Sequence, residues 1–188
     1  MHEIEPFYRW RDYYVASDDA LSPFNGREYS EFQYSTKIYN YFIHPQWDEI
    51  GSPTLFAKII YANYQMGFSV IELMGEWNDC IQNDVMFLKQ NVINPQMNQG
   101  INKFIIIGEN VLNFHYSDDC YYEEWNEEVT DEGGWVTMVN FREHILYEMD
   151  QIHLSQYLFT YNNILWRKLK PMAFCLAMEK LISHKLLV

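Results

Sequence analysis

Apolar residues along the chain form four short runs, separated by segments in which apolar residues recur at helical spacing. The runs cover residues 38–43, 68–74, 103–107 and 135–139. The third consists of Lys103, Phe104 and three isoleucines, so that after the lysine both alternating faces are apolar. A short run of this kind, rich in β-branched residues, is typical of a strand covered on both sides. The pattern therefore predicts four strands in the interior of a sheet.

Helix signals follow each predicted strand. The first helix is expected to start at Ser52 and Pro53, a favourable N-cap and first residue, and to end at Gly67. Its inward positions are Leu55, Phe56, Ile59, Ile60 and Met66. The second helix is predicted from Asn78 or Asp79 to a point before Pro95, with an apolar stripe at a period of 3.6 residues. The remaining two are an acidic helix after Ser117, burying Tyr122, Trp125 and Val129, and a helix after Asn140 bearing Ile145, Leu146, Met149 and Ile152.

Strands and helices that alternate about every thirty residues indicate consecutive βα units. The predicted fold is therefore α/β: a mostly parallel sheet of about four βα units, flanked by helices on both faces in three layers. We expect one domain over residues 1–188. Residues 1–36 would form edge strands or a hairpin, residues 37–154 the βα core, and residues 155–188 a C-terminal helical extension in which Pro171 starts a helix. The extension is basic and amphipathic, but its bulky residues favour docking on its own domain over a membrane surface.

Charge narrows the range of partners. The chain has 188 residues, 48% of them hydrophobic, and a net charge of −13. A nucleic-acid partner requires a basic surface, and no cluster of Lys and Arg precedes the C-terminus, so the sequence argues against one. Residues 109–132 contain nine acids and no Lys or Arg, whereas residues 167–188 contain five basic residues and one acid. These two segments could pair with each other or with a second copy.

The cysteines and the N-terminal residues indicate the cellular compartment of the protein. Cys80, Cys120 and Cys175 are far apart and lack the spacing of a disulfide framework or a zinc site. Residues 1–6 are acidic and lack the apolar region of a signal peptide. No apolar run approaches the roughly 20 residues that span a bilayer. We therefore expect a cytoplasmic protein that does not associate with a membrane.

Candidate ligand-binding residues follow the predicted strands, because parallel strands place their C-terminal loops at one edge of the sheet. They are carboxylates, amides, one histidine and one arginine, groups that could bind a divalent cation or provide a general acid and base. The candidates are His44, Glu76, Asn78, Glu109, Asn110, Asn140 and Arg142. No metal ligand set is assigned among them.

Two of the predicted strands end in the same dipeptide, Gly75-Glu76 and Gly108-Glu109. If the two strands are neighbours, a strand spacing of about 4.8 Å would place the two glutamates side by side, where they would share a proton or a cation. If another strand lies between them, this pairing fails. Alternatively, each glycine only makes a turn and each glutamate is a solvated acid near a helix N-terminus.

Catalytic motifs are missing from the sequence. It contains no GxGxxG, GxxxxGK[ST], GxSxG or HExxH pattern, which removes the main support for dinucleotide, P-loop, serine hydrolase and zincin chemistry. We therefore expect a non-enzymatic cytoplasmic interaction or regulatory module, acting as a homodimer or with a protein partner. The alternative is a divalent-metal-dependent enzyme or small-ligand receptor that uses the acidic strand ends.

Overall fold

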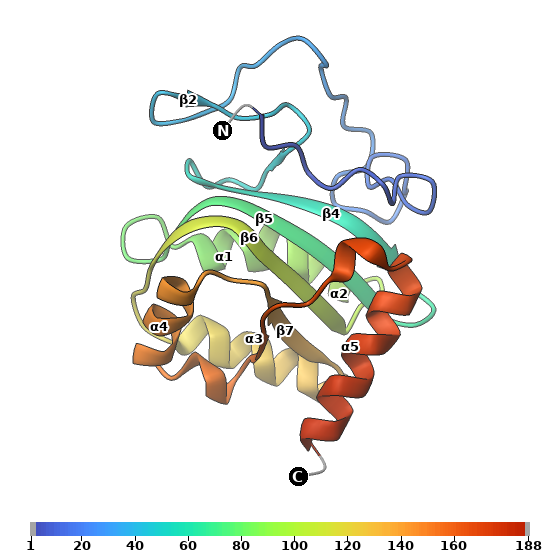
Figure 1. The fold of residues 1–188 in the computed structure, drawn as a ribbon, viewed down its shortest axis with the longest axis vertical. Coiled ribbons are helices and arrows are strands. Elements are labelled where there is room, and N and C mark those ends of the chain that lie inside the picture. Colours follow the sequence, from blue (N-terminus) through green and yellow to red (C-terminus); the bar gives the residue numbers. More distant parts are fainter. Residues whose placement is uncertain (1–2, 187–188) are drawn as a thin grey trace.

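The computed structural model describes residues 3–186, which form a six-stranded sheet with helices on both of its faces (Figure 1). The strand order is β3-β4-β5-β6-β7-β8, antiparallel from β3 to β5 and parallel from β5 to β8. These strands are β3 (Asp48–Glu49), β4 (Leu55–Asn63), β5 (Phe68–Asn78), β6 (Lys103–His115), β7 (Trp135–Val139) and β8 (Phe159–Tyr161). A separate two-stranded ribbon pairs β1 (Lys37–Ile38) with β2 (Tyr41–Phe42).

The helices connect and cover the parallel strands. After β5 the chain forms α1 (Asp84–Leu88), a π-helical turn η1 (Lys89–Ile93) and α2 (Asn94–Met97). Then follow α3 (Cys120–Asp131), α4 (Glu143–Gln151), the 3-10 turns η2 (Leu154–Gln156) and η3 (Trp166–Lys168), and α5 (Pro171–Leu186). Among the described residues, none of these helices has both the length and the apolar character needed to cross a membrane.

Two apolar layers lie on opposite faces of the sheet. On one face, the strands pack against residues of the α1–α2 segment, α3 and α4, such as Leu88, Trp125 and Ile145. On the other, they pack against α5 and the N-terminal segment, through residues such as Phe174 and Trp10. Figure 1 shows α5 apart from the helices α1 to α4. The predicted α/β fold with a mostly parallel sheet and helices on both faces is confirmed.

The first predicted βα unit is wrong. Residues 38–43 form the small ribbon β1–β2 rather than a core strand. The predicted helix from Ser52 to Gly67 is instead the loop before β4, β4 itself and a tight turn into β5. The local capping chemistry is present, since the Ser52 hydroxyl accepts hydrogen bonds from the backbone N–H groups of Thr54 and Leu55 at 3.0 and 2.9 Å.

Apolar residues at helical spacing predicted a helix here, although the segment is a strand, because β4 is buried on both faces. Leu55, Ala57 and Ile59 point into one apolar layer, and Ile60 and Tyr61 into the other. A strand covered on both sides is apolar nearly throughout, so residues at helical spacing are apolar as well. Residues 55–63 form a strand because they pair with β5 in a hairpin. The register of this hairpin runs from Leu55 opposite Gly75 to Asn63 opposite Phe68.

The other predicted strands occur, but two extend further than expected. β5 and β6 continue past Gly75 and Gly108 to Asn78 and His115, so neither glycine ends a strand. The strand over residues 135–139 is confirmed as β7, and β8 was not predicted. Four βα units are present because β8 and α5 replace the wrongly placed first unit.

The predictions for the chain ends differ in outcome. Described residues 3–36 contain turns but no strand, so the predicted N-terminal edge strands are wrong for that segment. The antiparallel edge of the sheet is instead β3. The helix predicted to start at Pro171 is confirmed as α5. The helices α3 and α4 bury Tyr122, Trp125 and Ile145 as predicted.

Candidate functional site

A cleft of about 490 Å³ lies at the C-terminal ends of the parallel strands β7 and β8, beside the part of β6 that contains Glu109. Most of its wall comes from the residues that follow β7 and β8 in the sequence. The lining residues are Glu109, Asn140, Phe141, Arg142, Glu143, Asn162, Asn163, Ile164, Leu165, Trp166, Arg167 and Lys168. This is the edge of the sheet where α/β proteins generally bind ligands.

Asn140 connects the two loops that form the cleft. It follows β7 with a φ of 55°, in the left-handed region that asparagine tolerates better than most residues. Its side-chain amide donates to the Ile164 carbonyl at 2.9 Å, and its side-chain oxygen accepts from the Ile164 N–H at 2.9 Å. The same amide donates to the Glu109 carboxylate at 2.8 Å. One side chain thus joins β6 and the end of β7 to the loop after β8.

Glu109 is surrounded by hydrogen-bond donors. Its Oε1 accepts from the Asn140 amide and the Trp166 indole N–H, both at 2.8 Å. Its Oε2 accepts from Nε and Nη2 of Arg167 at 3.1 and 2.5 Å. Burial raises the pKa of this carboxyl, but the hydrogen bonds from Asn140, Arg167 and Trp166 outweigh it and lower the pKa below its usual value. Glu109 is therefore a fixed, ionised acceptor.

Arg167 also reaches a second carboxylate, Glu72, at 3.2 Å. The Glu72 side chain is completely buried and accepts from the Phe7 backbone N–H at 2.8 Å and from the Asn110 amide at 3.3 Å. Burial raises the pKa of Glu72 to about 7, with Phe7 and Arg167 acting in the opposite direction. One guanidinium therefore joins two carboxylates of different basicity, and we call this cluster (Glu72, Glu109 and Arg167) the carboxylate–arginine cluster.

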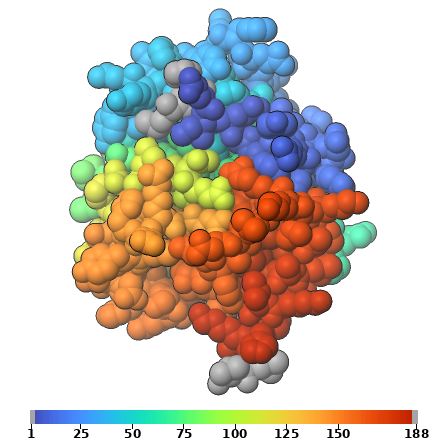
Figure 2. Space-filling view, in the orientation of Figure 1, coloured from blue at the N-terminus to red at the C-terminus, as the bar shows by residue number. Residues whose placement is uncertain are grey.

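The N-terminal segment closes one side of the carboxylate–arginine cluster. The Arg167 guanidinium lies 5.2 Å from the ring centre of Phe7 and 4.5 Å from that of Trp166. The Trp10 indole donates to the Leu169 carbonyl at 3.0 Å. Figure 2 shows this blue segment against the orange-red residues that precede and begin α5. Residues at the two ends of the chain thus cover Glu72 together.

The structure brings three of the seven predicted site residues into the cleft: Glu109, Asn140 and Arg142. Asn110 lies next to it through its hydrogen bond to Glu72. The other three predicted residues have partners elsewhere. His44 packs on Tyr34 and accepts from the Gln46 N–H, Glu76 bonds Tyr39 and Asn113, and Asn78 caps the turn at Ile81.

The predicted pairing of Glu76 with Glu109 does not occur, although β5 and β6 are neighbours. The pairing of Phe68 with Lys103 already aligns Glu76 with a residue beyond Glu109, and two register shifts carry it further, so that Glu76 lies opposite Asn113. Gly108 belongs to the first shift, and a Cβ there would lie 2.3 Å from the Phe141 ring. The glycine therefore admits the Phe141 ring against β6 and does not end the strand.

Sequence reasoning missed Glu72, Trp166 and Arg167. Glu72 interrupts an otherwise apolar strand, and a charged residue in the centre of a buried strand requires a partner. That signal was available in the sequence. Arg167 follows a segment without strong periodicity, and only the packing of the loop after β8 shows that it reaches Glu72.

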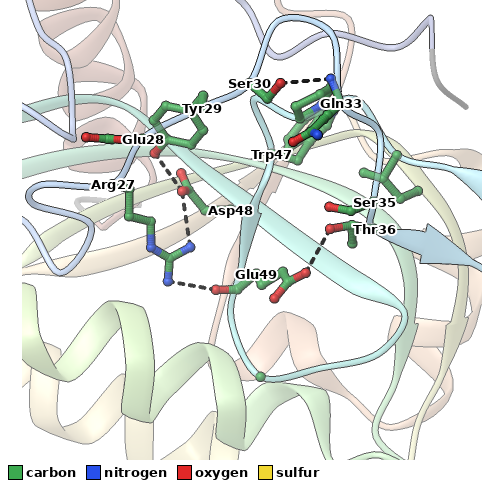
Figure 3. A pocket seen from close by; sticks show the side chains of 13 residues that line it. Arg27, Glu28, Tyr29, Ser30, Gln33, Ser35, Thr36, Trp47, Asp48 and Glu49 are labelled. Carbon is green, nitrogen blue, oxygen red and sulfur yellow. Dashed lines mark hydrogen bonds and ion pairs between the residues drawn. The ribbon is translucent and has the colours of Figure 1, made fainter.

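A second pocket, of about 470 Å³, lies beside β3 and the segment 27–36 (Figure 3). Arg27 donates to the Asp48 carboxylate at 3.2 Å and to the Glu49 carbonyl at 3.1 Å. The Thr36 hydroxyl donates to the Glu49 carboxylate at 2.8 Å. None of the seven predicted site residues lines this pocket.

No protein-family model matches the chain, and no curated protein matches it. Solved structures that are similar to it include two that carry the designation TM1081. The crystal structure of a proposed anti-sigma factor antagonist (TM1081) from Thermotoga maritima is 15% identical with a TM-score of 0.41, covering 51% of this chain and 80% of that one. The NMR structure of the protein TM1081 is 14% identical with a TM-score of 0.41, covering 69% and 90%. Similarity at this level supports no conclusion about what this chain binds.

The solvent-facing part of the cleft differs in charge from the chain as a whole. Arg142 and Lys168 line it, are exposed, and form no ion pair with any residue of the described range 3–186; the exposed Glu143 of the same lining is also unpaired, so two such cations face one acid. Leu165 lies on the same wall with 69% of its surface exposed. An apolar side chain with two unpaired cations on one surface fits an acidic ligand with an apolar part.

Asn140→Ala is expected to destabilise the protein by about 2–3 kcal/mol. The substitution leaves the Ile164 N–H and C=O groups without their side-chain partner, and it places an alanine in the left-handed conformation. Asn140→Gly should cost about 1 kcal/mol less, because glycine adopts the left-handed conformation without strain. Urea denaturation of the two variants and the parent measures both values. Equal losses in the two variants would mean that the left-handed conformation of Asn140 carries no strain.

Proposed function

We propose that this chain is a non-enzymatic binding module that docks an acidic segment of a partner protein on the cleft at the ends of β7 and β8, beside β6. The observation that carries the proposal is the free surface formed by Arg142, Lys168 and Leu165 on a chain of net charge −13. Unpaired cations on an otherwise acidic protein attract an acidic segment to this part of its surface. Leu165 supplies the apolar contact around which such an interface is built.

The internal pairing of the carboxylates supports binding rather than catalysis. Glu109 accepts four hydrogen bonds, and Glu72 is enclosed by Phe7, Asn110 and Arg167. A general acid or base must be able to reach a proton on the substrate. Both side chains instead serve to position Arg167 and the loop after β8.

The metal-dependent alternative receives less support from the geometry. Within residues 3–186, no group of three His, Cys, Asp or Glu side chains is arranged to bind a metal ion. Glu76 and Glu109, the pair on which that alternative depended, lie opposite different residues and have separate partners. We therefore assign the cleft to a protein segment.

A cytoplasmic location belongs to the same proposal. The cysteines Cys80, Cys120 and Cys175 are all free, as in proteins of a reducing compartment. A homodimer, in which the acidic α3 of a second copy would be the ligand, is the competing occupant of the cleft. Light scattering of the protein alone separates the two.

Binding is tested with short synthetic peptides that contain a leucine flanked by glutamates, and with matched peptides in which lysine replaces glutamate. We expect the acidic peptides alone to bind, with affinity that falls as salt rises. Arg142→Glu combined with Lys168→Glu should weaken binding by at least about ten-fold, and Leu165→Ser by a similar factor. Fluorescence anisotropy measures the dissociation constants.

Lys180→Glu is the control, because it reverses one exposed charge on α5 outside the cleft. It should leave peptide binding within about two-fold of the parent. The proposal would be overturned if acidic and basic peptides bind with equal affinity. It would also be overturned if Lys180→Glu weakens peptide binding as much as the cleft variants do. Light scattering of the protein alone tests for the competing occupant. If the parent is a dimer and the double variant Arg142→Glu, Lys168→Glu is a monomer, the ligand of the cleft is a second copy of the chain.

A further inference from the structure

A third pocket, separate from the cleft, lies between the N-terminal segment and β4. Its volume is about 190 Å³, and its walls include Phe7, Val15 and Ile60 on the apolar side and Tyr29 and Lys58 on the polar side. None of these residues lines the cleft or belongs to the carboxylate–arginine cluster. A cavity of about 150 Å³ holds a benzene molecule, so this pocket has the size of a small organic ligand.

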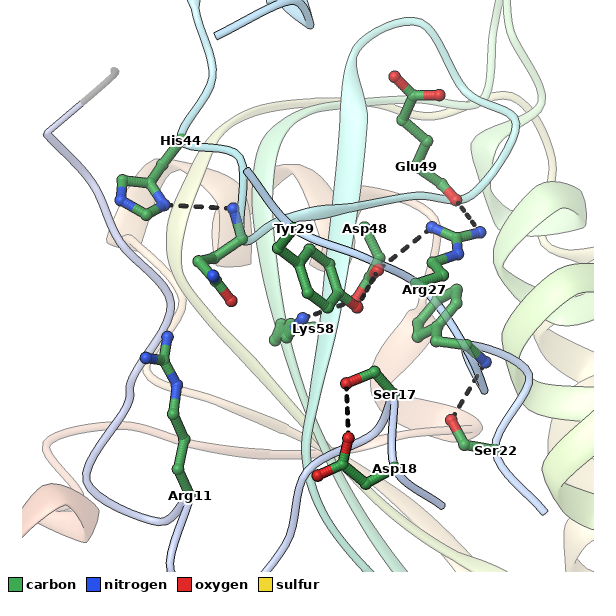
Figure 4. Close-up of polar contacts among 12 residues, drawn as sticks. Arg11, Ser17, Asp18, Ser22, Arg27, Tyr29, His44, Asp48, Glu49 and Lys58 are labelled. Carbon is green, nitrogen blue, oxygen red and sulfur yellow. Dashed lines mark hydrogen bonds and ion pairs between the residues drawn. The ribbon is translucent and has the colours of Figure 1, made fainter. Parts of the chain in front are cut away.

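Lys58 is a nearly buried cation in the wall of this pocket. Its side chain is 12% exposed, and its ammonium group donates to Asp48 Oδ2 at 3.0 Å and lies 3.7 Å from the centre of the Tyr29 ring. Figure 4 shows Lys58, Tyr29 and Asp48 together. An ammonium group has three donors, and Asp48 takes one of them. The group therefore retains the capacity to bind a further acceptor from the pocket.

Positive charge exceeds negative charge around Lys58. Asp48, which is fully buried, is shared with Arg27 at 3.2 Å and also accepts from the Tyr29 hydroxyl at 2.6 Å. Arg11 lines the same pocket and, within residues 3–186, forms one ion pair, with Glu5 at the surface. Burial lowers the pKa of Lys58, and Arg11 and Arg27 act in the same direction, whereas Asp48 opposes them. A second anion beside Lys58 would relieve this excess.

We propose that this pocket binds a small organic carboxylate. The carboxylate group pairs with the Lys58 ammonium, with Arg11 contributing positive charge from the wall. The apolar body of the ligand packs against Phe7, Val15 and Ile60. A desolvated ammonium at one end of an apolar pocket favours an acid over a neutral molecule of the same shape, because only the acid offers a charged acceptor to the N–H donors that Asp48 leaves free.

The probe is benzoate, and its neutral counterpart is benzyl alcohol. Titrations followed by amide shifts in two-dimensional NMR spectra should show saturable shifts at residues 7, 15 and 60 with benzoate, and at least about ten-fold weaker binding of benzyl alcohol. Inorganic phosphate, which has the charge but no apolar body, should not compete. Equal binding of benzyl alcohol, or displacement of benzoate by phosphate, would overturn the assignment to a carboxylate with an apolar body.

Two variants test the site by independent routes. Lys58→Met removes the cation but leaves Arg27 and Tyr29 on Asp48, and should weaken benzoate binding at least about ten-fold. Val15→Trp fills the pocket without changing any charge and should abolish binding even if Lys58→Met folds poorly. Lys180→Glu is again the control and should bind like the parent. Benzoate shifts that persist unchanged in Val15→Trp would place the ligand elsewhere and overturn the proposal.

Discussion

Gly75→Ala is expected to destabilise the protein by more than about 4 kcal/mol, which exceeds the cost of most single substitutions and prevents folding of a marginally stable domain. A Cβ at this position would lie 2.0 Å from the Thr54 carbonyl oxygen and 2.8 Å from Ile38 Cδ1. That carbonyl is backbone, and it already accepts the hydrogen bond of the Glu76 N–H at 2.9 Å. The φ of Gly75 is 115°, so an alanine would also be strained.

Gly26→Ala is the matched control for Gly75→Ala. Gly26 has a φ of 72°, but nothing lies within 4 Å of the added Cβ. The control therefore isolates the backbone strain, which costs about 1–2 kcal/mol. Urea denaturation followed by circular dichroism compares the two variants. If Gly75→Ala loses no more stability than Gly26→Ala, the close packing of β5 at Gly75 on Thr54, the residue before β4, is refuted.

Glu72→Gln is expected to remove a pH dependence of stability of about 3 kcal/mol. Burial raises the pKa of Glu72 from its usual 4.5 to about 7 in the folded protein, so the folded state takes up a proton that the unfolded chain does not yet bind. The free energy of unfolding of the parent should therefore rise as the pH falls through about 7 and level off near the pKa of the unfolded chain. This contribution is fully present at low pH and is lost as the pH rises through 7.

The measurement is the difference in unfolding free energy between parent and Glu72→Gln, from about pH 8 down to about pH 5. Burial also raises the pKa of Asp84, to about 6, and that of Asp79. Both aspartates titrate in parent and variant alike, so the difference isolates Glu72. Glu31→Gln, at an exposed glutamate, controls for the loss of one carboxyl group. A difference that does not change with pH would show that Glu72 keeps its usual pKa in the folded protein.

The arrangement at Glu72 also connects stability to the proposed docking surface. Arg167 joins Glu72 to Glu109, and both the Trp166 indole and the Asn140 amide donate to Glu109. The loop that carries Leu165 and Lys168 is therefore positioned by buried groups on β5 and β6. Changes at Glu72 should alter peptide affinity through that loop without touching the peptide.

The local pattern of apolar residues was sufficient to predict the strands at the centre of the sheet. The runs at residues 68–74, 103–107 and 135–139 are strands because they are apolar on both alternating faces, a property of the residues themselves. The same holds for α3, α4 and α5, whose buried residues recur at helical spacing. The run at residues 55–61 was misassigned because a strand buried on both faces and a buried helix have the same apolar pattern.

For the candidate site, the sequence by itself determined that Asn140 and Arg142 follow a strand and that Glu109 follows the apolar run of β6, and so placed all three at one edge of the sheet. Only the tertiary structure decided their partners. The register between β5 and β6 places Glu76 opposite Asn113 instead of Glu109, and the loop after β8 brings Arg167 to Glu72, which is 95 residues away in the chain. Side-chain spacing is a local property, whereas strand register and the pairing of buried charges depend on packing between segments that are distant in sequence.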